Sequence, residues 1–168
     1  MGKRLILHDL PSGNLEHAGL SVTADDTVFS AEPIVGPCVG CYGCWIKTPG
    51  ACVVDDRAKG FASLISGHDE FVVVSRLVFG GFSPSVKAAL DRSIGYILPF
   101  FNLVNNETHH PKRGSKKMAL RYIFYGDNMN STDKEIAQKL TAANALNLSA
   151  EKYSAEFFEP DPAVRITV

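Results

Sequence analysis

All four cysteines of the chain fall in one short segment, and they are the residues whose spacing most clearly suggests chemistry. Cys38, Cys41, Cys44 and Cys52 form the pattern C-x2-C-x2-C-x7-C. Short spacings let successive thiolates converge on one centre, and the glycines between them ease the necessary turn. Three close cysteines and one distant cysteine favour a [4Fe-4S] cluster over a tetrahedral zinc ion. A dithiol–disulfide switch, or four inert thiols that shape a tight loop, are the alternatives.

The bulk composition limits the classes of partner. The chain has 168 residues, 17 Lys and Arg against 18 Asp and Glu, and a net charge of −1. This balance lacks the positive field typical of proteins that bind nucleic acid or anionic membranes, and no apolar run is long enough to span a bilayer. His8 and Asp9 interrupt the N-terminal apolar run where a signal peptide would continue it. We therefore expect a cytoplasmic protein, with no nucleic acid or membrane as partner and with its thiols reduced.

The elements that must position the cysteines alternate between strands and helices. Apolar runs predict strands at 3–7, 27–31, 70–79 and 118–125, with a last strand within 152–158. Helices are expected at 56–66 after an Asp55 cap, at 84–98 after Ser83, and from a Thr132/Glu135 capping box to about 147. Alternation of this kind implies parallel pairing in one α/β domain covering 1–168. The expected architecture is a three-layer sandwich with the flavodoxin-like strand order 2-1-3-4-5 and a shortened first crossover.

Ligands of such sheets bind at the carboxyl ends of the strands. That edge should gather three segments: 8–14 after the first strand, the cysteine loop 33–50, and 75–83. Gly80 and Gly81 in the third segment would let the backbone approach a flat ligand, although they could equally well only end the strand.

At this point the chain resembles a known family. The stretch PCVGCYGCWIKTPGACVVDD, at 37–56, is similar to the signature of NADPH-dependent FMN reductase-like proteins, and within them to iron–sulfur flavoproteins and their cluster-free relatives. A second match is GGFSPSVKAALDRSI at 80–94, continuing through LPFF at 98–101. The resemblance implies a flavodoxin-like fold, FMN at the carboxyl edge, and electron transfer to or from that flavin.

The resemblance also implies the residues of the flavin site. In the family, the segment before the second helix wraps the flavin ring, and the turn after the first strand cradles the FMN phosphate. The expected contacts are Ser75, Arg76, Leu77, Phe79, Gly80 and Gly81 for the ring, with Ser12 and Asn14 in the first turn. No catalytic residue is singled out.

The first turn departs from the family pattern. Its members carry a Gly-Ser-rich turn there, whereas this chain has HDLPSGN followed by Glu16, and Asp9 and Glu16 would repel a phosphate. Either the ring holds FMN, or another element binds the phosphate, or the flavin site has been lost.

Two functions are compatible with these residues. The first is a flavin-dependent oxidoreductase or electron-transfer protein that uses FMN, exchanges electrons with NAD(P)H or a redox partner, and has a cluster at the cysteines. The basic residues between His109 and Lys117 could then attract the extra phosphate of NADPH, or form a solvated loop. The alternative is a cofactor-free flavodoxin-like module for binding or thiol-redox sensing.

We also expect a homo-oligomer, most simply a dimer. The segment after the second helix carries Phe100, Phe101, Leu103 and Val104 in quick succession, and exposed apolar clusters usually mark interfaces. In a rival interpretation this segment extends the helix and caps the core.

Overall fold

The sheet at the centre of the molecule contains five parallel strands, and its order is β2-β1-β3-β6-β7. The computed structural model describes residues 2–11 and 14–159 of the chain. The strands are β1 (Arg4–His8), β2 (Thr27–Ser30), β3 (Glu70–Arg76), β6 (Ala119–Tyr125) and β7 (Lys152–Phe158). With β6 and β7 as the fourth and fifth strands of the sheet, this order is the flavodoxin-like one expected from the sequence.

The central strands owe their position to uninterrupted apolar runs. In β3, the four residues Phe71–Val74 are all fully buried, and they pair with β1 on one side and β6 on the other. A strand buried on both faces needs apolar side chains at successive positions, which is why this run has no polar alternation. The edge strand β2 is shorter, and its side chains are only partly buried.

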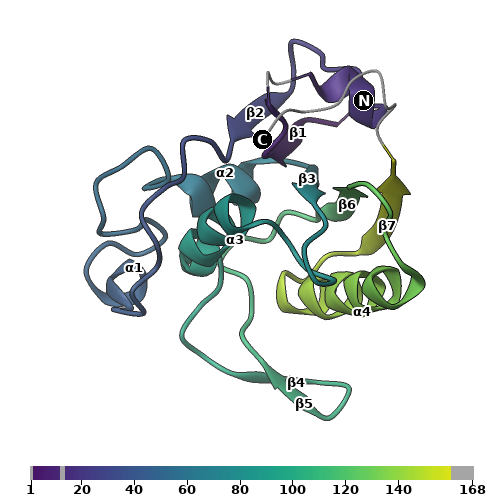
Figure 1. Cartoon of the computed structure of the whole chain (residues 1–168). Coiled ribbons are helices and arrows are strands. Elements are labelled where there is room, and N and C mark those ends of the chain that lie inside the picture. Colours follow the sequence, from purple (N-terminus) through teal and green to yellow (C-terminus); the bar gives the residue numbers. More distant parts are fainter. Residues whose placement is uncertain (1, 12–13, 160–168) are drawn as a thin grey trace.

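Three helices cover one face of the sheet (Figure 1). They are α2 (Phe61–Gly67), α3 (Pro84–Asp91) and α4 (Ser131–Asn147). Phe61 from α2, Val86 from α3 and Ala137 from α4 belong to one buried cluster with the side chains of Leu5 and Tyr122. Pro84 occupies the first turn of α3, where its missing N–H costs nothing, and the Ser83 hydroxyl accepts the Val86 N–H.

The opposite face has a thinner cover within the described residues. The described part of the first crossover contains only the 3-10 turn η2 (Leu15–Ala18), which packs with Leu10 and Leu20 over Val72 and Ile123. Toward β7 this face is polar, since Arg121 forms a bidentate ion pair with Glu156 at 2.7 Å. The shortened first crossover is confirmed.

Two expected helix starts are wrong. The helix after the cysteine loop begins at Phe61, not at residue 56, and Gly60 rather than Asp55 precedes it. Asp56 instead forms an ion pair with Arg92, outside any helix. Likewise α4 is capped by Asn130, whose side-chain oxygen accepts the Asp133 N–H at 2.8 Å, rather than by a box at Thr132.

The helix expected over 84–98 is α-helical only as far as Asp91. It continues as a tighter 3-10 turn, η3 (Arg92–Tyr96), in which Arg92, Gly95 and Tyr96 are buried. The narrower turn lets the loop containing Gly50 lie against the backbone of Gly95, where a Cβ atom would come within 3.1 Å of it.

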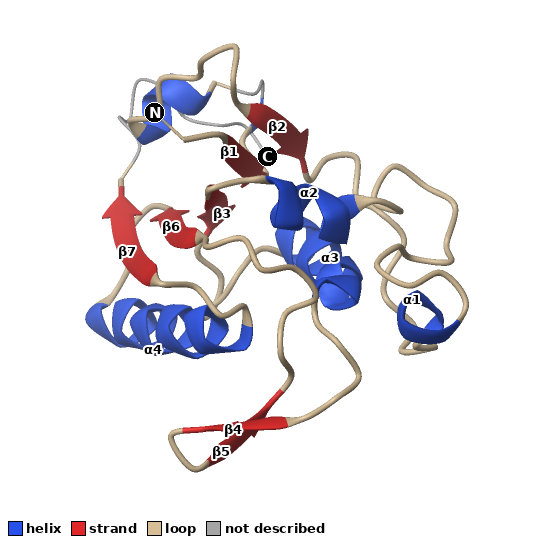
Figure 2. Ribbon diagram, turned by 180° about the vertical axis from the view of Figure 1, so that it is seen from behind, coloured by secondary structure: helices blue, strands red, loops and turns tan. Residues whose placement is uncertain are grey.

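The segment after η3 forms a hairpin where the sequence suggested a long loop. Strands β4 (Asn102–Val104) and β5 (Glu107–His109) pair through Asn105 and Asn106, both at positive φ, as the mirror-image hairpin turn requires. Figures 1 and 2 show this hairpin extending away from the sheet.

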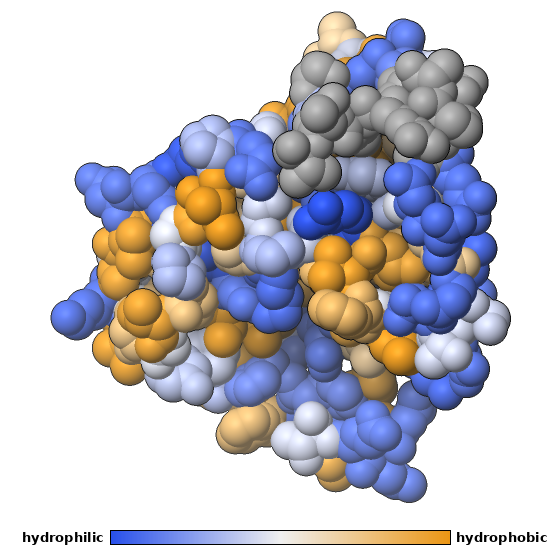
Figure 3. Space-filling view, viewed as in Figure 1, coloured by the Kyte–Doolittle hydropathy of each residue, from blue (hydrophilic) through white to orange (hydrophobic). Residues whose placement is uncertain are grey.

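The apolar residues beside the hairpin are exposed rather than packed on the core. Phe100, Phe101 and Leu103 lie between 65% and 75% exposed, so the interpretation of this segment as a helical cap of the core is wrong. Further apolar surface lies over the cysteine loop, at the left of Figure 3. Within the described part of the chain, no helix is both long and apolar enough to cross a membrane.

Candidate functional site

The cysteine segment leaves the sheet after β2 and forms a loop beside α3 and η3 (Figure 1). Its only helix is the single turn α1 (Gly43–Ile46), preceded by Tyr42 in the left-handed conformation at φ 55°. Gly43 is required there, because a Cβ atom would come within 2.4 Å of the Val53 side chain. Cys44 is buried in this turn, whereas Cys38 and Cys41 are exposed.

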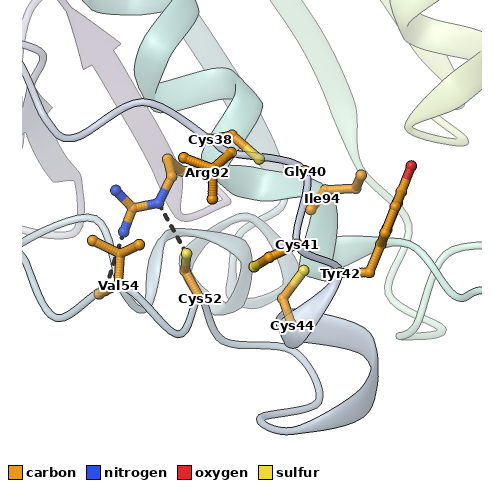
Figure 4. A pocket seen from close by; sticks show the side chains of 10 residues that line it. Cys38, Gly40, Cys41, Tyr42, Cys44, Cys52, Val54, Arg92 and Ile94 are labelled. Carbon is orange, nitrogen blue, oxygen red and sulfur yellow. Dashed lines mark hydrogen bonds between the residues drawn. The ribbon is translucent and has the colours of Figure 1, made fainter.

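The four cysteines line one small pocket (Figure 4). Its wall is completed by Tyr42, Val54, Arg92 and Ile94, among others. The convergence that the spacing predicted is therefore present. The pocket is almost entirely apolar apart from the sulfur atoms and the Arg92 guanidinium.

Arg92 is the best-connected side chain of the site. Its side chain is fully buried, and its guanidinium pairs with both carboxylate oxygens of Asp56 at 2.8 Å. It also donates to the carbonyls of Gly36 at 2.8 Å and Val54 at 3.2 Å, and Nε donates to the Cys52 Sγ at 3.0 Å. All five N–H donors of the guanidinium are thus used.

The contacts and burial of the site shift the pKa values of Asp56, Arg92 and Cys44. The hydrogen bonds from Arg92 hold the pKa of the Asp56 carboxyl below its usual value, and Asp56 in turn raises the pKa of Arg92. Burial raises the pKa of the Cys44 thiol, with smaller contributions from the charges of the other three cysteines. Cys44 is therefore a protonated thiol near neutral pH.

The rest of η3 also binds the cysteine loop. Trp45, next to Cys44, donates its indole N–H to the carbonyls of Ile94 at 3.1 Å and Ile97 at 2.9 Å. Its ring stacks on Tyr42 and contacts His110. The loop is thus held by backbone and side-chain contacts at both ends of η3.

The pocket does not have the geometry of a metal centre. Among the described residues, no three His, Cys, Asp or Glu side chains are placed so that they could share a metal ion. The [4Fe-4S] cluster and the zinc ion that the cysteine spacing suggested therefore have no support among the described residues.

The second expected site lies at the other end of α3. After β3 the chain makes a tight turn in which Val78 and Gly81 exchange backbone hydrogen bonds at 3.0 and 2.9 Å. Phe79 at φ 49° and Gly80 at φ 76° form the corner of this turn. A bulky residue at positive φ is strained, and strain of this kind clusters at functional sites.

The residues expected to touch the flavin ring differ in accessibility. Phe79 is 92% exposed and Arg76 is exposed, whereas Leu77 and Gly81 are partly buried. Ser75 is fully buried, where its hydroxyl accepts the Ser83 N–H at 2.9 Å.

Gly80 has a packing role that the sequence did not reveal. It is buried, and a Cβ atom at this position would come within 2.6 Å of Ile136 on α4. Its missing side chain therefore leaves room for α4. A larger residue there would disturb the packing of α4 as well as any ligand.

The first turn of the chain presents a carboxylate at the sheet edge. Asp9 is only 9% exposed, and both of its oxygens lie 3.2 Å from the Arg76 N–H. Asn14 contacts His17 at 3.1 Å, while Ser12 lies outside the described residues. A phosphate placed here would meet a buried carboxylate, so the described residues do not fit the FMN phosphate.

One buried polar atom near this edge has no partner. His8 ends β1 with 3% exposure, and its Nδ1 atom makes no hydrogen bond. Burial lowers the pKa of His8, so its ring is neutral near pH 7. A neutral imidazole supplies little attraction for a phosphate.

The basic residues after the hairpin do not converge on a site. Lys116 pairs with Asp69 at 3.0 Å and Lys117 pairs with Glu151 at 2.7 Å. Arg113 donates to the Gly95 carbonyl at 3.0 Å. These side chains are used locally, which favours the interpretation as a surface loop over a binding site for the NADPH phosphate.

Comparison with known proteins identifies the class of fold. No protein-family model and no curated protein sequence matches the chain. Solved structures do match: an FMN-dependent NADH-azoreductase from Bacillus anthracis in complex with FMN has a TM-score of 0.55 at 16% identity, covering 97% of this chain and 91% of that chain.

Two further structures show the same similarity. NAD(P)H:quinone oxidoreductase from Methanothermobacter marburgensis has a TM-score of 0.58 at 16% identity, covering 94% of this chain and 86% of that chain. General stress protein 14 from Treponema denticola, in complex with FMN, has a TM-score of 0.54 at 18% identity, covering 96% and 88%. The chain has the same flavodoxin-like fold as these three proteins.

Sequence reasoning missed the ion pair between Arg92 and Asp56. Asp91 and Arg92 are adjacent in the chain, but Asp91 pairs with Lys87 on the helix surface while Arg92 turns inward. The cysteine motif ends in two aspartates, and the structure shows that the second, Asp56, is the partly buried one that pairs with Arg92.

The ion pair predicts a specific pH dependence of stability. Because the pKa of Asp56 is lower in the folded state, its contribution is complete above the unfolded pKa of about 3.9 and is lost as the pH falls through the folded pKa. We expect Asp56→Asn to lower the free energy of unfolding at pH 7 by about 3 kcal/mol and to flatten its decline between about pH 5 and 2. Urea unfolding over this range measures both effects.

The matched control is Asp55→Asn. Asp55 is exposed and contacts only Lys59, so this variant should unfold like the parent protein at every pH. Equal acid sensitivity of the Asp56→Asn variant and the parent would contradict the assignment.

Proposed function

We propose that this chain is a flavin-dependent oxidoreductase or electron-transfer protein that binds the flavin ring at the carboxyl edge of its sheet. The observation that carries the proposal is the fold, which the chain shares along nearly its whole length with an FMN-dependent NADH-azoreductase and with general stress protein 14, both in complex with FMN. A bound flavin would supply reversible one- and two-electron chemistry. NAD(P)H, by analogy with the names of the similar proteins, is the proposed electron donor.

The ring is proposed to lie against the turn Val78–Gly81. The strained turn presents Phe79 to solvent, and Gly81 adds accessible backbone that has no side chain. An aromatic side chain and a bare backbone suit a flat heterocycle. Arg76, exposed at the end of β3, adds a cation at the same edge.

The phosphate is not proposed to contribute to binding. Asp9 fixes a carboxylate between the ends of β1 and β3, where a dianion would be repelled. Because Asp9 disfavours the phosphate and the turn Val78–Gly81 is accessible, we propose that the chain recognises the flavin through its ring alone.

This arrangement predicts that the phosphate of FMN weakens binding relative to riboflavin. We expect riboflavin to bind about tenfold more tightly than FMN, and Asp9→Asn to bring the two dissociation constants within about threefold by strengthening FMN binding alone. Quenching of flavin fluorescence measures both affinities. Asp25→Asn, an exposed change just before β2 and therefore at the opposite edge of the sheet, serves as the control and should alter neither affinity.

The two ways in which this experiment can fail are distinct. Binding of FMN a hundredfold tighter than riboflavin by the parent protein would contradict the role of Asp9. No binding of either flavin would contradict the proposed function itself.

We also propose that two copies associate through the hairpin. Phe101 and Leu103 are 70% and 75% exposed on a segment that projects from the sheet, and burying them against a second copy would remove them from water. Sedimentation equilibrium should give twice 18.2 kDa for the parent protein and 18.2 kDa for Leu103→Asp, with Glu107→Gln as a matched hairpin control. A monomeric parent protein at micromolar concentration would contradict the proposal.

A further inference from the structure

We propose that Cys52 and Cys44 form a reversible dithiol–disulfide centre in which Cys52 reacts first with hydrogen peroxide and Cys44 completes the disulfide. The inference concerns the pocket beside η3 rather than the sheet edge. It therefore goes beyond the proposed flavin function and does not depend on it.

Cys52 is distinguished from the other cysteines by its contact with a buried cation. Arg92 Nε donates to the Cys52 Sγ at 3.0 Å. The same guanidinium is fixed by Asp56 and two backbone carbonyls, which hold it in place beside the sulfur. A hydrogen bond from a cation stabilises a thiolate, which is the nucleophilic form of cysteine. The backbone is also held, because the Cys52 N–H donates to the Lys59 carbonyl at 2.8 Å.

Cys44 has the properties of the second thiol. It lines the same pocket, is 6% exposed, and keeps its proton because burial raises its pKa. Of the other cysteines, Cys52 exerts the largest charge effect on Cys44. Figure 4 shows the side chains of Cys41, Cys44 and Cys52 turned toward a common space. The exposed Cys41 is the competing partner.

The pocket also favours a small oxidant. Cys38 and Cys41 leave its outer wall accessible, while Cys52 is only partly exposed and Cys44 is buried. A hydroperoxide with two heavy atoms can enter such a space more readily than a disulfide of a bulky thiol.

The reaction is balanced in two steps. The Cys52 thiolate attacks one peroxide oxygen, an S–O bond forms as the O–O bond breaks, and hydroxide leaves to become water. The Cys44 sulfur then attacks the sulfur of the Cys52 sulfenic acid, the S–S bond forms as the S–O bond breaks, and a second water leaves with the Cys44 proton. Two thiols are oxidised by two electrons and one peroxide is reduced to two waters; a small dithiol reductant reverses the change.

The sequence makes this disulfide easy to assign. Cleavage by trypsin after Arg4, Lys47 and Arg57 leaves Cys52 alone in peptide 48–57 and the other three cysteines in peptide 5–47. The reduced full-length protein is treated with one equivalent of hydrogen peroxide, alkylated, digested and analysed by mass spectrometry. We expect the two peptides to be linked, and the link to disappear on reduction.

Matched variants identify the partner and the role of Arg92. In Cys44→Ser the link should be lost and a Cys52 sulfenic acid should be trapped by dimedone, whereas Cys41→Ser and Cys38→Ser should retain the link. Arg92→Lys, checked for its fold by circular dichroism, should slow the oxidation about tenfold. The dimedone result tests Cys52 even if the Arg92 variant does not fold.

Three results would overturn the proposal. Oxidation confined to peptide 5–47 would exclude Cys52, and retention of the link in Cys44→Ser would exclude Cys44. Stoichiometric iron or zinc in the purified protein, with all four thiols resistant to peroxide, would assign the pocket to a metal instead.

Discussion

Burial of the Arg92 guanidinium is the constraint on which the arrangement of the cysteine loop depends. Removing a guanidinium from water is costly unless its charge and every N–H are satisfied. Here all the acceptors, from Gly36 to Asp56, belong to the segment that carries the cysteines. The folded domain therefore specifies the conformation of a loop that has little regular structure of its own. Cys52 contributes by accepting a hydrogen bond from the buried guanidinium.

The helix α3 joins the two candidate sites. Its N-terminus follows the turn that contains Phe79, and its 3-10 extension holds the cysteine pocket through Arg92. With a rise of about 1.5 Å per residue, the nine helical steps from Ser83 to Arg92 separate the two ends by about 14 Å. The fold thus places the turn that contains Phe79 and the thiol pocket at opposite ends of one helical element.

The sequence predicted what local patterns control. Apolar runs identified the five strands, and the Ser-Pro pair identified the start of α3. The cysteine spacing also predicted that the four thiols would share a pocket. The sequence could not reveal the pairing of Arg92 with Asp56, because these residues are far apart in the chain. Asp55 carries the same charge as Asp56, and Asp91 is a nearer carboxylate to Arg92 along the chain. Nor could the sequence show that Gly80 makes room for Ile136. The Asn-Asn turn of the β4–β5 hairpin was a local signal that could have been recognised.

Hydrogen exchange of the Arg92→Met variant tests most directly whether this buried charge holds the loop. Methionine is similar in length but offers no donors. The account predicts that amides between residues 36 and 56 lose about a hundredfold in protection, as expected for the loss of a few kcal/mol of local stability, while those of β1, β3 and β6 remain protected. Unchanged protection of the loop, or an equal loss throughout the sheet, would contradict the account.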